Sequence, residues 1–144
     1  MKSTIRRGAW PVLLALLLLW SGTAEAGHRM SEDEMTAAFN GITLDGIYYD
    51  GTFFTEAYHD DGSIRYWDAV GADAGQWTVE KGQFCTFYDG QQGACFTAIR
   101  DGDNCFTFYE KDPKTGEIDE GKWTSRGWNR AHNNTCPEAP EAKL

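Results

Sequence analysis

The sequence has few of the residue types that enzymes use as nucleophiles, bases or metal ligands. It holds three histidines, no G-x-S-x-G segment and no C-x-x-C pair. The absence of G-x-S-x-G argues against an α/β-hydrolase, and the absence of C-x-x-C argues against a zinc site. Zincin and phosphate-loop motifs are absent as well. We therefore expect a non-enzymatic protein with no cofactor and no metal.

Basic residues are also scarce, with 13 Lys and Arg against 22 Asp and Glu, a net charge of −9. They are scattered along the chain and do not form the basic stripe of a nucleic-acid-binding protein. An acidic surface repels both nucleic acid and anionic membranes. We expect neither to be a partner.

A long hydrophobic run is missing too, because the apolar stretch from Ala9 to Trp20 is shorter than the roughly 20 residues that span a bilayer. Basic residues precede it, and Ala24-Glu25-Ala26 offers small residues at a cleavage position. Residues 1–26 are therefore predicted to be a cleaved signal peptide with no membrane span left afterwards. No cysteine lies just after the apolar run, which disfavours a lipid-anchored lipoprotein. Gly8-Ala9 after Arg6-Arg7 is atypical of a twin-arginine signal, so we favour ordinary export to the periplasm or secretion.

The cysteines that are present all lie in the exported part. Cys85, Cys95 and Cys105 are ten residues apart, and each begins or lies in a short segment of aromatic residues and Thr. Such segments suit half-buried strands, and the spacing fits one strand plus one turn. An even number of cysteines in an oxidising compartment predicts two disulfides.

Four cysteines allow three pairings. If the chain reverses around Gly90, Cys85 and Cys95 stand opposite each other at a Cα separation that a disulfide tolerates. We therefore predict Cys85–Cys95, which leaves Cys105–Cys136 to hold the C-terminal segment. A Cys85–Cys105 bridge would show this register to be wrong.

A short helix is predicted at the start of the exported chain. Ser31 followed by Glu34 forms a capping box, and Asn40-Gly41 gives a stop, so the helix covers about 32–39. Met35 and Phe39 share its apolar face. We expect this face to cover an open end or edge of a sheet.

Strand-like runs separated by short turns such as Asp61-Gly62 follow this helix. They predict an all-β fold, an antiparallel up-and-down meander of about eight strands that forms a small barrel or cup. One disulfide-linked domain is expected over 27–136, with a disordered tail over 137–144. The predicted strands cover about 46–49, 52–59, 63–70, 75–80, 83–88, 94–100, 105–110 and 121–125.

Aromatic residues occur on both faces of these strands. Phe54, Glu56 and Tyr58 alternate with Phe53, Thr55 and Ala57. The aromatic rings either fill a barrel that lacks Leu and Ile, or line a site for a sugar or a small amphipathic ligand. The candidate ligand-binding residues are Tyr58, Tyr66, Trp67, Glu56, Arg65 and Asp68.

The partner is accordingly expected to be a small molecule, an envelope glycan or an envelope protein. A protein-interaction or inhibitor module is the main alternative, and it predicts a solid interior with an apolar patch outside. An enzyme ranks third: His59 lies beside two aspartates, and Glu56 with Asp68 forms a possible carboxylate pair. A calcium loop over 112–120 is disfavoured because Lys114 stands where an oxygen ligand belongs.

The chain also contains four short motifs: Phe39-Asn40-Gly41-Ile42-Thr43, Asp61-Gly62, Gly75-Gln76-Trp77, and Cys85 with Cys95. Together they resemble a family of small exported alphaproteobacterial domains of unknown function. The similarity covers about Met30 to Cys136 and implies export and architecture, but no activity. The segment from Lys111 to Gly121 is longer and more acidic than that pattern. A weaker likeness to lipocalin-type barrels is an analogy, because Gly-x-Trp occurs at Gly75 and Gly121 and not directly after the helix.

Overall fold

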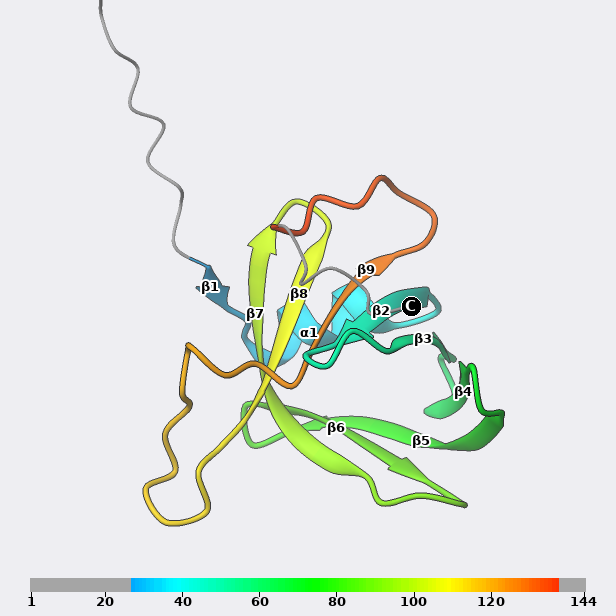
Figure 1. Ribbon diagram of the computed structural model, residues 1–144, viewed down its shortest axis with the longest axis horizontal. Helices are drawn as coiled ribbons and strands as arrows, with labels where there is room; N and C mark the ends of the chain where they lie inside the picture. Colours follow the sequence, from blue (N-terminus) through cyan, green and yellow to red (C-terminus); the bar gives the residue numbers. More distant parts are fainter. Residues whose placement is uncertain (1–26, 138–144) are drawn as a thin grey trace, which may run out of the picture.

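The computed structural model describes residues 27–137, so the predicted signal peptide and almost all of the predicted C-terminal tail lie outside the described residues (Figure 1). The described part is mostly β-sheet with one short helix. Its elements are β1 (His28–Arg29), α1 (Glu32–Phe39), β2 (Thr43–Tyr48), β3 (Phe53–Tyr58), β4 (Ser63–Asp68), β5 (Ala72–Glu80), β6 (Gln83–Tyr88), β7 (Ala94–Gly102), β8 (Cys105–Glu110) and β9 (Ser125–Asn129).

Strands β2 to β9 form a closed antiparallel barrel in which each strand pairs with the next one along the chain. The pairing of β9 with β2 closes the barrel, and the short β1 adds to β7. Figure 1 shows the ribbon curling from β2 through β5 and β6 to β7 and β8. The predicted up-and-down meander is confirmed, and the sheet closes into a barrel rather than an open cup.

The closing seam depends on two glycines that stand opposite each other, Gly46 on β2 and Gly127 on β9. A Cβ atom at Gly46 would lie 2.3 Å from the ring of Phe54, and one at Gly127 would lie 2.6 Å from Leu44. The Phe54 ring therefore covers the backbone at Gly46, and the Leu44 side chain covers the backbone at Gly127. Without a Cβ atom, each glycine leaves room for the side chain that packs over the seam.

The position of the last strand was predicted wrongly. The sequence pattern placed it at 121–125, but β9 covers Ser125–Asn129. Residues 121–124 belong to the long connection after β8, which runs outward from the barrel (Figure 1). The polar sequence of β9 shows little alternation, and it is extended because β2 and β8 pair with it on both sides. β1 was not predicted, since two residues carry no pattern.

The helix closes one end of the barrel. Ser31 caps it, with the hydroxyl accepting from the Glu34 amide and the Glu34 carboxylate accepting from the Ser31 amide. Met35 and Phe39 are fully buried, and the Phe39 ring centroid lies 4.6 Å from that of Phe84 and 5.0 Å from that of Phe106. The predicted helix, its cap and its covering role are confirmed.

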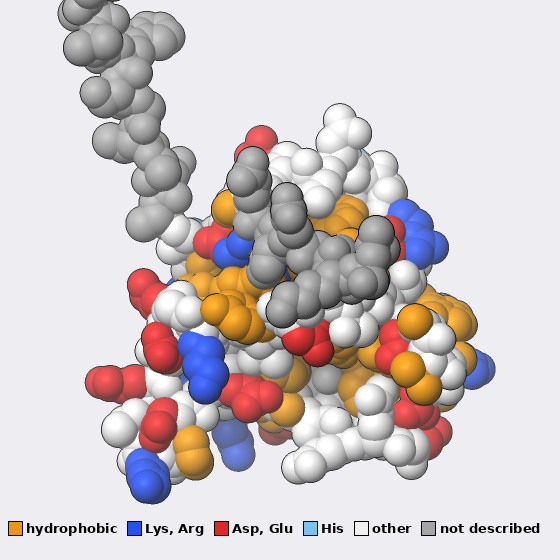
Figure 2. All heavy atoms as spheres, in the orientation of Figure 1, with side chains coloured by type: hydrophobic (Ala, Val, Ile, Leu, Met, Phe, Trp, Pro, Cys, Tyr) orange, Lys and Arg blue, Asp and Glu red, His pale blue; other side chains and the backbone are white. Residues whose placement is uncertain are grey.

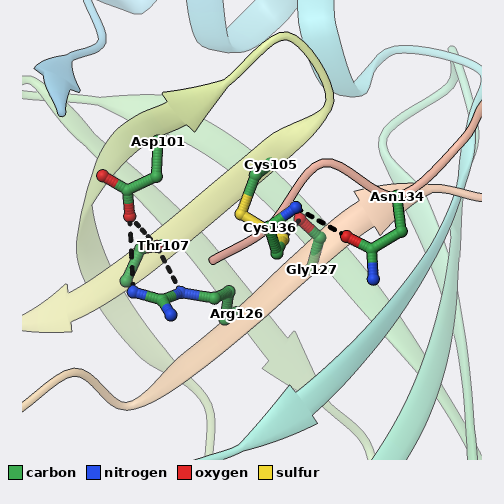
Figure 3. Close-up of polar contacts among 7 residues, drawn as sticks. All are labelled: Asp101, Cys105, Thr107, Arg126, Gly127, Asn134 and Cys136. Atoms are coloured by element: carbon green, nitrogen blue, oxygen red, sulfur yellow. Dashed lines mark hydrogen bonds and ion pairs between the residues drawn. A yellow bond between two sulfur atoms is a disulfide. The ribbon is translucent and has the colours of Figure 1, made fainter. Parts of the chain in front are cut away.

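Both predicted disulfides are present. Cys85 pairs with Cys95 in the expected register, and their Cα atoms are 4.0 Å apart. Cys105 pairs with Cys136 and holds the chain that follows β9 against β8, as Figure 3 shows. Two disulfides indicate an oxidising environment outside the cytoplasm. Within residues 27–137, no helix is long and apolar enough to cross a membrane.

Candidate functional site

The barrel interior contains a cavity of about 190 Å³ beside the layer that Phe39 packs against. Its walls come from β2, β3, β6, β7, β8 and the first residue of β9, with the segments that precede β7 and β9. Tyr58, Phe84 and Phe108 belong both to the wall and to the layer around Phe39. The lining residues are Tyr48, Phe54, Glu56, Tyr58, Phe84, Thr86, Tyr88, Gln92, Gly93, Ala94, Phe96, Phe108, Glu110, Thr124 and Ser125.

Glu56 is the buried charged group of this cavity, with 6% of its surface exposed. Strand alternation turns it inward between Phe54 and Tyr58. The Tyr58 hydroxyl donates to Oε2 and the Tyr88 hydroxyl donates to Oε1. Both carboxylate oxygens are therefore held, from β3 itself and from β6 across the barrel.

Burial sets the electrostatics of this cluster. It raises the pKa of Glu56, because the charged form loses its hydration, and the two tyrosine hydroxyls offset this only in part. The pKa values of Tyr58 and Tyr88 are also raised, first by burial and then by the Glu56 charge. The two tyrosines therefore stay protonated and act as donors.

A second tyrosine chain lies next to this cluster. The Tyr48 hydroxyl donates to that of Tyr66 at 3.4 Å, and Tyr66 donates to Asp68 Oδ2 at 2.9 Å. Backbone N–H groups of Gly71 and Val70, together with Tyr66, lower the pKa of Asp68. Asp68 is therefore an anion at the end of the chain, closer to solvent than Glu56 is.

The six candidate residues from the sequence do not form one site. Glu56 and Tyr58 line the cavity, and Tyr66 and Asp68 connect to it through Tyr48. Trp67 and the Arg65 side chain lie on the outer face, because they alternate with Tyr66 along β4. The structure therefore brings four of the six candidates together and places Trp67 and Arg65 apart from them.

Sequence reasoning missed Tyr88, Tyr48 and Glu110 as parts of the site. Tyr88 ends a strand that was predicted correctly, so its inward direction followed from alternation. Its approach to Glu56, 32 residues away, required the closed barrel. Glu110 reaches the cavity because β8 pairs with β7, where it stands opposite Phe96.

The outer face carries an open groove over β9, β2, β3 and β4. Trp128 and Trp67 lie at its two sides, with Asp45 and Thr55 between them on the intervening strands. The Arg130 guanidinium donates to Asp45 Oδ1 at 2.6 Å and Oδ2 at 2.9 Å, and to Thr55 Oγ1 at 3.0 Å. This hydrogen bonding lowers the pKa of Asp45.

The other charged groups of the described chain are not arranged as a metal site. Within residues 27–137, no three His, Cys, Asp or Glu side chains are grouped as metal ligands. The Asp112 carboxylate accepts from the backbone amides of Lys114 and Thr115, so it closes a turn. On the face in Figure 2, acidic and basic side chains are interspersed, and the basic ones form no continuous stripe.

Arg126 and Asp101 form an ion pair near the Cys105–Cys136 disulfide. Arg126 Nη2 lies 3.6 Å from Asp101 Oδ2, and Arg126 Nε donates to Thr107 Oγ1 at 2.9 Å (Figure 3). Thr107 in turn donates to Asp101. These groups are outside the cavity and join β7, β8 and β9.

No family model matches the chain, and comparison with curated proteins and with solved structures found no significant similarity. The resemblance to small exported domains and the analogy with lipocalin-type barrels therefore stay predictions. The cavity and the outer groove are the features of the described chain that indicate a function.

Proposed function

We propose that the protein is an exported, non-enzymatic binding protein that holds a small ligand in its barrel cavity. The observation that carries this proposal is the aromatic wall around the buried carboxylate of Glu56. Binding pockets combine apolar and aromatic walls with a few placed polar groups, and this cavity has that composition. The two disulfides agree with an exported protein, in the periplasm or outside the cell.

The volume of the cavity limits the size of the ligand group that it can enclose. Its volume of about 190 Å³ is below the range of drug-sized pockets, which begins at about 300 Å³. It exceeds the cavity of about 150 Å³ that holds benzene in an engineered protein. The enclosed part of the ligand is therefore no larger than one sugar ring or a branched amine.

Filling the cavity tests this proposal. Ala94 lines it at the start of β7 and is partly exposed, so Ala94→Trp puts an indole into the opening with little cost to the core. We expect this variant to lose at least about tenfold in affinity for any bound sugar or amine, measured by calorimetry and ligand-observed NMR. Ala131→Trp, in an exposed loop after β9, is the matched control. Equal affinities in both variants would contradict a cavity site.

The outer groove supports a second candidate function, glycan binding. Two indoles that flank a carboxylate, a hydroxyl and a guanidinium offer both stacking surfaces and hydrogen-bond partners for a sugar chain. Neighbouring strands lie about 4.8 Å apart, so the indoles, three strands apart, span about 14 Å, the length of a short oligosaccharide.

Affinity electrophoresis in gels that contain soluble cell-wall oligosaccharides tests the groove. Trp67→Ala and Trp128→Ala should each remove the retardation, and Phe87→Ala, an exposed aromatic residue outside the groove, should keep it. Unretarded wild-type protein would contradict glycan binding. Loss of binding to an envelope protein in the same tryptophan variants would instead support the interaction module.

A further inference from the structure

The cavity has charge of one sign only. Two carboxylates line it, Glu56 in its depth and the more exposed Glu110 on β8. None of the fifteen lining residues, all within the described chain, is Lys, Arg or His. An anionic ligand would meet repulsion without compensation here.

The deeper carboxylate has no cationic partner within residues 27–137. The ion pairs of that region join His28 with Glu34, Arg126 with Asp101, and Arg130 with Asp45, all away from the cavity. Glu56 instead receives two neutral donors, Tyr58 and Tyr88. A buried carboxylate without a counter-ion is costly, so a cation that enters the cavity recovers part of this free energy.

The walls add a second source of attraction for a cation. Seven of the lining side chains are Phe or Tyr, and aromatic faces attract ammonium groups through their ring quadrupoles. Tyr48 and Phe54 form one corner, with ring centroids 4.5 Å apart. Tyr88 on β6 connects to this corner through Tyr66, whose ring centroid lies 5.5 Å from that of Tyr88 and 6.2 Å from that of Phe54.

A neutral sugar finds fewer partners in the same space. The hydroxyls of Tyr58 and Tyr88 already donate to Glu56, and that of Tyr48 donates to Tyr66. A sugar ring exposes several hydroxyl groups, each of which needs a partner when it is buried. The other polar side chains of the lining are those of Thr86, Gln92, Thr124 and Ser125, with Glu110 at the more exposed wall. These few side chains do not supply a donor and an acceptor for every hydroxyl group of a whole sugar ring.

We infer that the ligand of the barrel cavity is a small organic cation, a substituted amine or quaternary ammonium group, held by the Glu56 carboxylate and the surrounding aromatic rings. This inference rests on the proposed function and names its ligand class. A trimethylammonium group carries its charge without N–H donors, and it therefore suits a carboxylate whose two oxygens already accept hydrogen bonds.

An isosteric pair of probes tests the role of charge without any mutation. Choline and 3,3-dimethyl-1-butanol have nearly the same shape and differ in the charged nitrogen. We expect the mature protein to bind choline at least about tenfold more tightly than the alcohol, measured by calorimetry and by the shifts of aromatic NMR signals. Tetramethylammonium should compete with choline.

Substitution of Glu56 tests whether its carboxylate causes the preference for the charged probe. Glu56→Gln should lose at least about tenfold in affinity for choline and leave the affinity for the alcohol unchanged. Glu120→Gln, which removes the same charge from an exposed loop, is the matched control and should behave as wild type. If Glu56→Gln does not fold, Glu110→Gln at the more exposed wall should still weaken choline binding in part.

The outcomes separate the inference from the proposed function. Equal or tighter binding of the alcohol would overturn the cationic ligand and keep a cavity that binds small molecules. Choline binding that Ala94→Trp leaves unchanged would place the cation elsewhere and overturn the inference. Failure of choline, tetramethylammonium, the alcohol and simple sugars to bind would overturn both.

Discussion

Glu56 combines two properties that rarely occur together, near-complete burial and the absence of a cationic partner within the described chain. Tyr58 and Tyr88 hold both of its oxygens, and Tyr48, Tyr66, Asp68 and Glu110 are the other titratable groups around it. None of these neighbours carries a positive charge. A protein keeps such a group only at a cost in stability, which is why we assign it a role in binding.

This cost predicts a pH dependence. The pKa of Glu56 is raised above the ordinary value of 4.5, so the folded state binds its proton more tightly than the unfolded state does. The free energy of unfolding of the wild type relative to Glu56→Gln should therefore decrease as the pH rises from about 4.5 through the raised pKa. Carboxyl groups with lowered pKa values, such as Asp45 and Asp68, act in the opposite direction. They are present in both proteins and cancel in the difference.

Urea titrations of the two proteins between pH 4 and pH 8, without ligand, measure this difference. A difference that stays constant with pH would mean that Glu56 titrates alike in the folded and unfolded states. A saturating cation should flatten the decrease, because it stabilises the charged carboxylate.

Among the secondary-structure elements, α1 closes one end of the barrel, mainly with the ring of Phe39. Phe39 lies at its last turn, fully buried, and contacts aromatic side chains from β3, β6 and β8. Because Phe84 and Phe108 also form the cavity wall, the helix supports the binding site from behind. The packing of Phe39 therefore affects both the stability of the barrel and the shape of the cavity.

Removal of this ring should destabilise the whole barrel. We expect Phe39→Ala to lower the free energy of unfolding by about 3 to 5 kcal/mol, because it leaves a hole among rings that cannot collapse into it. Phe53→Ala, whose ring is 56% exposed on the outer face, should cost less than about 1 kcal/mol. Denaturation in urea, followed by fluorescence, measures both. Similar losses in the two variants would contradict the role of α1 as a plug.

At the scale of the whole molecule, two covalent links act on chain segments of different length. Cys85–Cys95 closes a hairpin of 10 residues, and Cys105–Cys136 closes 31 residues that include β9. Asn104 adds hydrogen bonds to the backbone of Asn129 and Asn133. The second disulfide thus fastens the strand that completes the barrel.

The two disulfides should therefore differ in their contribution to stability. Loop-closure entropy gives about 2.7 kcal/mol for the shorter loop and about 3.7 kcal/mol for the longer one. We expect the Cys105→Ala, Cys136→Ala double variant to be less stable than the Cys85→Ala, Cys95→Ala variant by about 1 kcal/mol in urea titrations. The reverse order would indicate that β9 remains closed without its disulfide.

Local sequence was enough to predict the parts of this protein that depend on near neighbours. The capping box at Ser31 and Glu34 places the helix, and the turn around Gly90 sets Cys85 opposite Cys95. Alternation assigns Glu56 and Tyr58 to one face of β3. These features depend on residues within about ten positions of one another, so their pattern is visible in the sequence.

The tertiary structure alone decided which of these side chains meet. Tyr88 reaches Glu56 because the ribbon closes on itself, and Trp67 and Arg65 are separated from the cavity because the barrel has an inside and an outside. β9 is a strand because β2 and β8 pair with it on both sides. Contacts between residues far apart in the chain leave no periodic pattern, and their free energy arises only when the whole barrel forms.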